Sequence, residues 1–250
     1  MWTFLHQLAS PPHFYRLARS LIPWLTVPAY ALLLYGTFAG LFLAPQDYQQ
    51  KDAFRIVYVH APAAYLSMMA YVVMAAAGGV GLIWRMKLAH AVAASAAPIG
   101  ASFTALALLT GSIWGRPMWG TWWEWGDPRL MSELILLFLY LGYMALRNAI
   151  DDTAKADKAS AVLALVGAVN VPVIHFSVEW WTSLHQTSTL LDEGGPAMDS
   201  AMLYPLLANI LGFTLLFGAL LLRRARSEVL SRERRARWVR DLVLQTGTRA

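Results

Sequence analysis

Long runs of apolar residues without charged side chains alternate along this chain with short polar segments. A helix needs about 20 consecutive apolar residues to cross the hydrocarbon core of a membrane. The runs that meet this length, or reach it with a short extension, are residues 21–43, 61–84, 91–113, 130–146, 159–178 and 200–222. The fourth run is charge-free only over 134–146, and it extends back to 130 if Glu133 faces the bundle. Because no alternating strand pattern competes with these runs, the sequence predicts an all-α integral membrane protein: one domain, 1–250, with six transmembrane helices.

The sequence also indicates where helices pack closely and whether the first span is retained. The segment Gly78–Gly81 contains three glycines, which allow neighbouring helices to approach closely. The first run is longer than the apolar core of a signal peptide, and no small-residue cleavage site follows it. We therefore interpret the first run as a retained span.

The distribution of basic residues predicts the orientation. Sixteen of the 20 Lys and Arg residues fall before the first span, between spans two and three, between spans four and five, or after span six. Basic residues favour the cytoplasmic side, so both termini are expected in the cytoplasm. The segments 44–60, 114–130 and 179–199 are then expected to face outward. The tail 223–250 is basic, and its part 223–240 is helical in character, which is typical of contact with anionic lipid or of a docking surface for a cytoplasmic partner.

Composition excludes several classes of function. Charged residues make up only 14% of the chain, against about 25% in soluble domains. The absence of cysteine excludes disulfides, thiolate metal sites and thioether-linked cofactors. No nucleotide-binding glycine motif or nucleophile–base motif stands out, so we expect a binding and transfer protein and no enzyme. Basic residues concentrate in the cytoplasmic tail, which argues against nucleic-acid binding.

Five of the 11 tryptophans lie within twelve residues of the second outward segment. They are Trp114, Trp119, Trp122, Trp123 and Trp125. One or two tryptophans at this depth are explained as interfacial anchors. Five, interleaved with Gly and Pro in a segment that does not fit a regular transmembrane helix, favour a platform for a flat aromatic ligand.

Histidines suggest what that ligand is. His60 ends the first outward segment and His185 lies in the third, near Trp180 and Trp181. Two imidazoles beside an indole platform suggest haem, whose iron accepts histidine nitrogens. His175 is a third candidate and ranks below the other two, because pairing with a neighbouring polar group explains it as well.

The motifs also resemble a known family. The segment 114–123, Trp-Gly-Arg-Pro-Met-Trp-Gly-Thr-Trp-Trp, followed by Trp125, Asp127 and Arg129-Leu130, resembles the WWD signature of haem-handling proteins. The segments 58–64 and 169–186, which contain His60 and His185, narrow the resemblance. Together they resemble the CcmC family, the haem-handling component of bacterial cytochrome c maturation. The resemblance covers essentially the whole chain.

The resemblance implies a role, a ligand and partners. CcmC-like proteins sit in the bacterial inner membrane, hold haem b transiently at their outer face and present it to the haem chaperone CcmE. They work with the ABC-type pair CcmA and CcmB and the small membrane protein CcmD. By resemblance, His60 and His185 are the axial iron ligands, and the tryptophan segment with Asp127 binds the haem. This chain has Gly126 between Trp125 and Asp127, where the family signature has Asp directly after the last Trp.

Two other functions remain open at this point. One is a transmembrane haem exporter or permease subunit, although the sequence shows no inner entry site and no energy-coupling feature. The other is a b-type haem electron carrier, which normally places histidines within its spans, whereas the candidate ligands here cluster at one face. Presentation of haem at the outer face is the first hypothesis.

Overall fold

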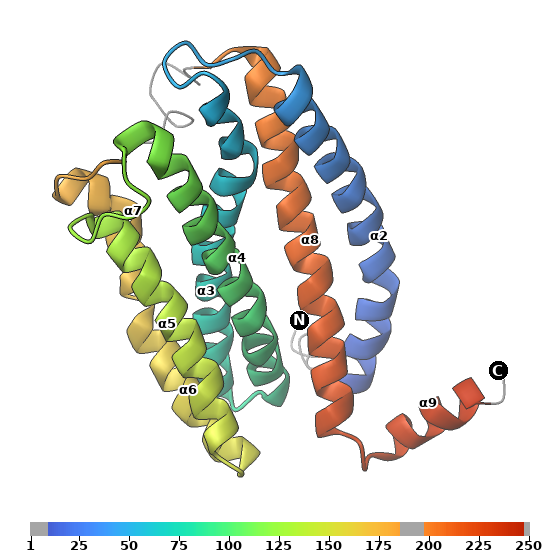
Figure 1. Cartoon of the computed structure of the whole chain (residues 1–250). Coiled ribbons are helices and arrows are strands. Elements are labelled where there is room, and N and C mark those ends of the chain that lie inside the picture. Colours follow the sequence, from blue (N-terminus) through green and yellow to red (C-terminus); the bar gives the residue numbers. More distant parts are fainter. Residues whose placement is uncertain (1–9, 186–197, 248–250) are drawn as a thin grey trace.

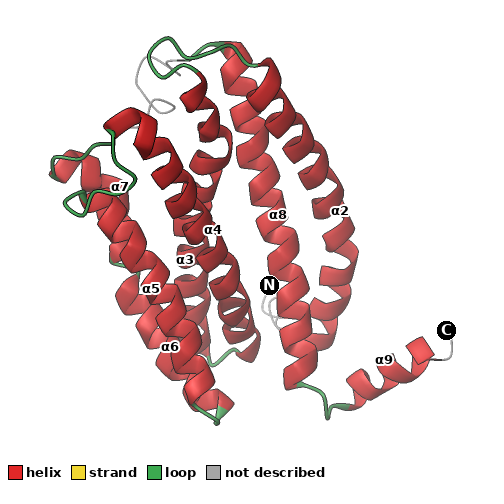
Figure 2. Ribbon diagram, viewed as in Figure 1, coloured by secondary structure: helices red, strands yellow, loops and turns green. Residues whose placement is uncertain are grey.

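A computed structural model describes residues 10–185 and 198–247 of the chain. These residues form helices joined by short loops, and no β-strand occurs among them (Figures 1 and 2). The elements in chain order are α2 (Pro11–Phe38) with a π-helical turn η1 (Ala39–Leu43), the 3-10 helix η2 (Asp52–Ile56), α3 (Val57–Trp84), α4 (Lys87–Trp119), α5 (Pro128–Ala149), α6 (Thr153–Gly167), α7 (Asn170–Trp180), α8 (Ser200–Arg232) and α9 (Arg237–Gly247).

The predicted six-span bundle is confirmed. Six helical segments of the described chain are long and apolar enough to cross a membrane, and each predicted span lies inside one of them. The fifth span is two helices, because α6 ends at Gly167 and α7 begins at Asn170. Pro172 lacks the N–H that a continuous helix would direct at the carbonyl of residue 168, which explains why the helix is interrupted here.

One expectation about the tryptophan segment is wrong. The α4 helix continues through Trp114 and Pro117 to Trp119, so the first six residues of the segment 114–130 are helical. The charged Arg116 and then Pro117 end the apolar run of the sequence, but they do not end the helix. It ends at Gly120, whose φ of 78° is the left-handed conformation that glycine adopts most easily.

The helices form three neighbouring pairs: α2 with α8, α3 with α4, and α5 with α6 (Figure 1). The α8 helix joins the first pair to the others through α3 and α4. The expectation of close approach at the glycine-rich segment is confirmed. A side chain at Gly78 would meet Ala161 of α6 at 3.2 Å, and one at Gly81 would meet the ring of His90 of α4 at 2.6 Å.

The bundle has two chemically different ends. We call the end with residues 44–56, 120–127 and 181–185 the tryptophan end, and the end with residues 85–86, 150–152 and 233–236 the arginine end. The α2 helix begins and α8 finishes at the arginine end (Figure 1). Most of the described part of the basic tail is helical: it forms the last turns of α8 and all of α9, with a turn at 233–236 between them.

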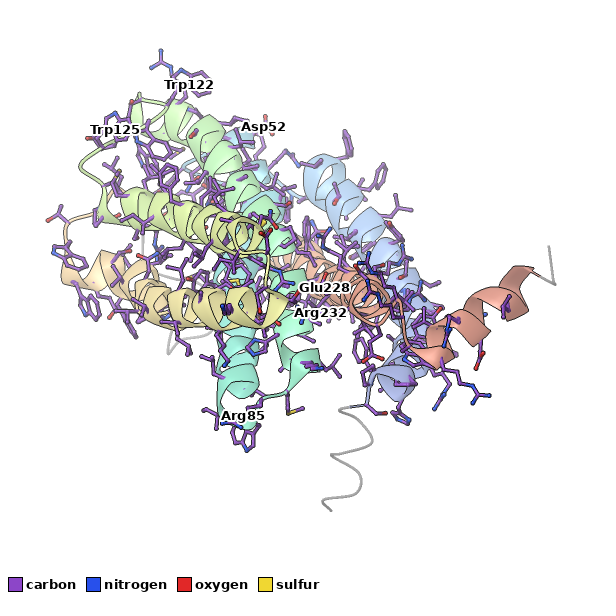
Figure 3. The ribbon with its side chains drawn as sticks, turned by 90° about the horizontal axis from the view of Figure 1, so that it is seen from below. Asp52, Arg85, Trp122, Trp125, Glu228 and Arg232 are labelled. Carbon is purple, nitrogen blue, oxygen red and sulfur yellow. The ribbon has the colours of Figure 1, made fainter. Side chains whose placement is uncertain are left out.

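A buried charge cluster closes the arginine end. Asp157 of α6 is 5% exposed and accepts hydrogen bonds from Arg147 of α5 and from Arg232 of α8, the latter at 2.7 and 3.0 Å. Glu228 accepts from the same two arginines, at 2.6 Å from Arg147 and 2.8 Å from Arg232. Figure 3 shows Glu228 and Arg232 side by side on α8. The cluster therefore ties α5, α6 and α8 together.

Candidate functional site

Three segments far apart in the sequence meet at the tryptophan end. The first turn of α3 carries His60, the end of α4 carries Trp114 and Trp119, and the short segment after α7 carries His185. The structure therefore places both predicted ligands at this end of the bundle.

His60 is held by α4 through one ring nitrogen. Its Nδ1 lies 3.0 Å from the Oγ1 of Thr110, and the Thr110 hydroxyl donates its own proton to the carbonyl of Leu106 at 2.7 Å. Because that hydroxyl has only one proton, it accepts from His60 Nδ1–H. The neutral imidazole then has an unprotonated Nε2, the form that binds a metal. Gly111 makes room for this ring, since a side chain there would meet His60 Cε1 at 3.0 Å.

His185 is held by Asp127 in the same manner. Its Nδ1 lies 3.4 Å from the Asp127 carboxylate, which has a fully buried side chain. The same carboxylate accepts from the backbone N–H of Leu130 at 2.9 Å, from the Ser183 hydroxyl at 2.7 Å and from the N–H of Leu184 at 2.8 Å. Asp127 is thus both the N-cap of α5 and the anchor of the segment 181–185.

The charge state of Asp127 follows from these bonds. Burial alone raises the pKa of a carboxyl group, but the hydrogen bonds from His185, Leu130, Ser183 and Leu184 outweigh it and hold the pKa of Asp127 well below its ordinary range. Asp127 is therefore an anion at any physiological pH. An anion at Nδ1 keeps the proton on that nitrogen and leaves Nε2 of His185 as the available donor.

The five tryptophans of this segment have three kinds of surroundings. Trp114 contacts the His60 ring at 5.5 Å between centroids, and Trp119 contacts the His185 ring at 4.9 Å. Trp123 is half-buried, and its indole nitrogen is buried without a hydrogen-bond partner in the described chain. Trp122 and Trp125 are 58% and 72% exposed and point outward at the rim (Figure 3).

Comparison with known proteins identifies the family that these motifs suggest. The family model CcmC, described as heme exporter protein C, matches residues 4–240. The chain belongs to the CcmC family. Among its relatives, heme exporter protein C of Escherichia coli (strain K12) is 50% identical over 99% of both chains. The protein of the same name in Bradyrhizobium diazoefficiens is 50% identical over 98% of this chain and 90% of its own. That of Paracoccus denitrificans is 41% identical over 94% of this chain and 97% of its own.

Asp127, the aspartate of the CcmC-family signature, is held in one place although Gly126 separates it from Trp125. Gly126 is exposed, and its N–H is bonded to the Glu124 side chain at 3.1 Å in the turn that leads to Asp127. The turn delivers the Asp127 carboxylate to the buried side of the loop, against His185. Its position favours a role in orienting His185 over direct contact with a ligand.

His175 of this CcmC-family chain lies apart from the two tethered histidines. Its ring is exposed on α7 and packs edge-on against Phe176 at 4.7 Å. Its backbone carbonyl accepts from Arg129 at 3.1 Å. The ring of His175 is therefore turned to the surface.

Several residues that support the site carry no recognisable sequence signal. Thr110 and Ser183 orient the two imidazoles, and Gln50 accepts from the Trp114 indole N–H at 2.9 Å. Thr110 is one of several hydroxyl residues in an apolar run, and only its contact with His60 distinguishes it. The remainder of the third outward segment, 186–197, lies outside the described residues.

The donor set fits haem better than a bare metal ion. Within the described chain, no group of three or more His, Asp or Glu side chains gathers to chelate an ion. Haem supplies four nitrogens of its own and needs only axial ligands from the protein. Two imidazoles with free Nε2 atoms, each beside an indole, offer that kind of ligation together with flat apolar contact.

Proposed function

We propose that this protein binds haem at the tryptophan end between His60 and His185 and presents it to the chaperone CcmE during cytochrome c maturation. One observation carries the proposal: each imidazole is tethered through Nδ1, which leaves Nε2 for iron, and each contacts an indole. The relatives that share the chain's full length are named heme exporter protein C, which supports haem as the cargo. We infer haem b as the form bound.

The partners and the location belong to the same proposal. We infer that the protein lies in the bacterial inner membrane with both termini in the cytoplasm and the tryptophan end in the periplasm. The basis is the excess of Lys and Arg at the arginine end. It acts with the ABC-type pair CcmA and CcmB and with CcmD, and its basic tail contacts membrane lipid. It transfers haem and catalyses no reaction of its own.

The exposed tryptophans at the edge of the site suit release of haem as well as its binding. Trp122 and Trp125 are largely exposed, and His185 retains 16% of its side-chain surface. A presenting protein has to give up its ligand, so moderate enclosure with one accessible edge suits that task. A closed pocket between spans would oppose transfer.

Haem ligation is tested on the purified protein. We expect His60→Ala and His185→Ala each to weaken haem retention and change the optical spectrum, and added imidazole to restore binding in part by filling the vacated axial position. The matched control is His175→Ala, whose ring is exposed and turned away. Wild-type haem content and spectra in both variants would exclude axial ligation by this pair.

Orientation is tested separately. Reporter fusions after Asp127 and after Arg147 should report opposite sides, with Asp127 in the periplasm. A cytoplasmic signal at Asp127 would overturn the assigned location.

Export of haem through the membrane is the second candidate, because the relatives carry the word exporter in their names. Protein reconstituted alone into vesicles distinguishes the two functions. Haem accumulation across the bilayer without CcmA and CcmB would favour export. Binding without passage, followed by covalent haem on added CcmE, is the result expected for presentation.

A further inference from the structure

A carboxyl group lies inside the bundle, where neither the fold nor the proposed haem ligation uses it. Glu133 is on the second turn of α5, within the predicted fourth span, and is 7% exposed. Its Oε1 is buried and has no hydrogen-bond partner in the described part of the chain. An ionisable side chain within a membrane span is costly, and it commonly marks a functional site.

The surroundings of Glu133 indicate which form of the carboxyl group is present. Ser67 of α3 is fully buried, and its hydroxyl donates to the carbonyl of Ala64 on its own helix at 2.7 Å. No ion pair to the Glu133 carboxyl occurs among the described residues. Because a buried charge without compensation is costly, this position favours the neutral carboxyl group.

The nearest cation does not change this conclusion. Arg129 precedes Glu133 by one helical turn, but its guanidinium donates to the carbonyls of Ile174 and His175 on α7, at 3.4 and 3.1 Å. Its Nε is buried without a hydrogen-bond partner among the described residues. Both described hydrogen bonds of the Arg129 guanidinium therefore go to α7 and none to Glu133. An unpaired carboxylate in this position would be poorly compensated.

Few other titratable groups face this carboxyl. Tyr140 of α5 donates to the Ser67 carbonyl at 2.8 Å and contacts Tyr71 of α3 at 5.0 Å between ring centroids. His60 lies two turns from Ser67 on α3, toward the tryptophan end. Between its first turn and Arg116, α4 has no charged residue, and between residue 158 and Glu179 the α6–α7 span has none. Glu133 is therefore the acidic group of the bundle interior nearest the tryptophan end.

We propose that Glu133 is a proton-binding site, protonated while the tryptophan end is empty, that releases its proton when a cation occupies that end. The cation is ferric haem iron if the proposed function holds, on which this coupling step rests. The carboxylic O–H bond breaks, its electron pair stays on the carboxylate, and the proton leaves to water at the tryptophan end. No electron is transferred, and the new carboxylate offsets the incoming positive charge.

The expected size of the coupling follows from distance. Glu133 lies six residues beyond Asp127 on α5, which corresponds to about 9 Å along the helix. A unit charge about 10 Å away, at an effective dielectric constant of about 20, shifts a protonation equilibrium roughly tenfold. Loading the site should therefore move the titration of Glu133 by about one pH unit toward acid.

The first test needs no haem. Infrared spectroscopy of the haem-free full chain in nanodiscs should show the C=O band of a protonated carboxylic acid at neutral pH. Glu133→Gln should remove this band, whereas Glu179→Gln, an exposed glutamate at the end of α7, should retain it. A band unchanged in Glu133→Gln overturns the proposal. If that variant does not accumulate in the membrane, Glu133→Asp must shift the band, and an unshifted band overturns it equally.

The second test measures coupling. Ferric haem is added to the same samples in weak buffer, and released protons are counted with a pH dye across a pH series. The wild type should release up to one proton per haem more than Glu133→Gln, with a maximum at one pH. Equal release by both proteins refutes the coupling. Failure to bind haem at all would refute the proposed function and the coupling, while the haem-free result on Glu133 would stand by itself.

Discussion

Replacing Asp127 by Asn tests whether this residue orients His185. The buried carboxylate accepts from the Ser183 hydroxyl and the Leu184 N–H at 2.7 and 2.8 Å, and lies 3.4 Å from His185 Nδ1. An amide of the same shape places an NH₂ group where one of these oxygens was. That group cannot accept a hydrogen bond, so the segment 181–185 loses part of its anchor.

The size of the effect can be worked from these contacts. A hydrogen bond to a charged group contributes about 1.5–3 kcal/mol, and loss of the carboxylate behind a metal-binding histidine typically costs about 10–100-fold in affinity. We therefore expect Asp127→Asn to weaken haem binding by that factor, which corresponds to about 1.4–2.8 kcal/mol. Helix content and membrane insertion should not change, because Asn replaces Asp well as an N-cap.

The assay is haem titration of purified protein followed by its optical spectrum, with membrane abundance measured in parallel. Asp199→Asn is a matched control, because Asp199 caps α8 at the same end through a bond from Ala201 N–H at 2.7 Å and contacts no histidine in the described chain. It should leave haem affinity unchanged. Wild-type affinity in Asp127→Asn, or an equal loss in Asp199→Asn, would refute the orienting role.

Three further predictions concern the tryptophans, the effect of acid and the charge cluster at the arginine end. Alanine at Trp119, which contacts the His185 ring, should lower covalent haem on CcmE more than alanine at exposed Trp122. The haem on CcmE is scored against the amount of this protein in the membrane. Unchanged CcmE loading in a combined Trp119, Trp122 and Trp123 alanine variant would contradict the platform, and loss of the protein would favour interfacial anchoring. Acid should release haem because only neutral imidazole binds iron. Since the pKa of Asp127 is depressed, the stability it contributes is complete above the ordinary pKa of aspartate, about 3.9, and is lost only as pH falls through the lower folded-state value. Spectra recorded as the pH is lowered should therefore show loss of haem before loss of helix. Asp157→Asn at the arginine end removes one of the two carboxylates that Arg147 and Arg232 share. Breaking a buried pair costs about 3–5 kcal/mol when nothing compensates the remaining charge, and Glu228 compensates in part, so thermal stability should fall by less than this while the spectrum of bound haem stays the same.

The sequence alone predicted the number of spans, because crossing a membrane depends on the length and apolarity of a local run. Each predicted span lies within an observed helix for this reason. The histidines and tryptophans were also visible as candidates, since short segments that join neighbouring spans on one side must lie at the same end of the bundle. The family motifs named His60, His185 and Asp127 together, but they did not say how these residues act on one another.

Only the tertiary structure decided those relations. Asp127 meets Ser183 across 56 positions of sequence, and His60 meets Thr110 across 50. Such contacts depend on how each helix is rotated about its axis and where it ends, and no local pattern contains that information. The same applies to Glu133: the sequence left its orientation open, and only the structure buries it and leaves its Oε1 without a hydrogen-bond partner in the described chain. It applies also to Arg147, Asp157 and Arg232, which appear in the sequence as separate loop and tail charges and become one cluster because three helices end together.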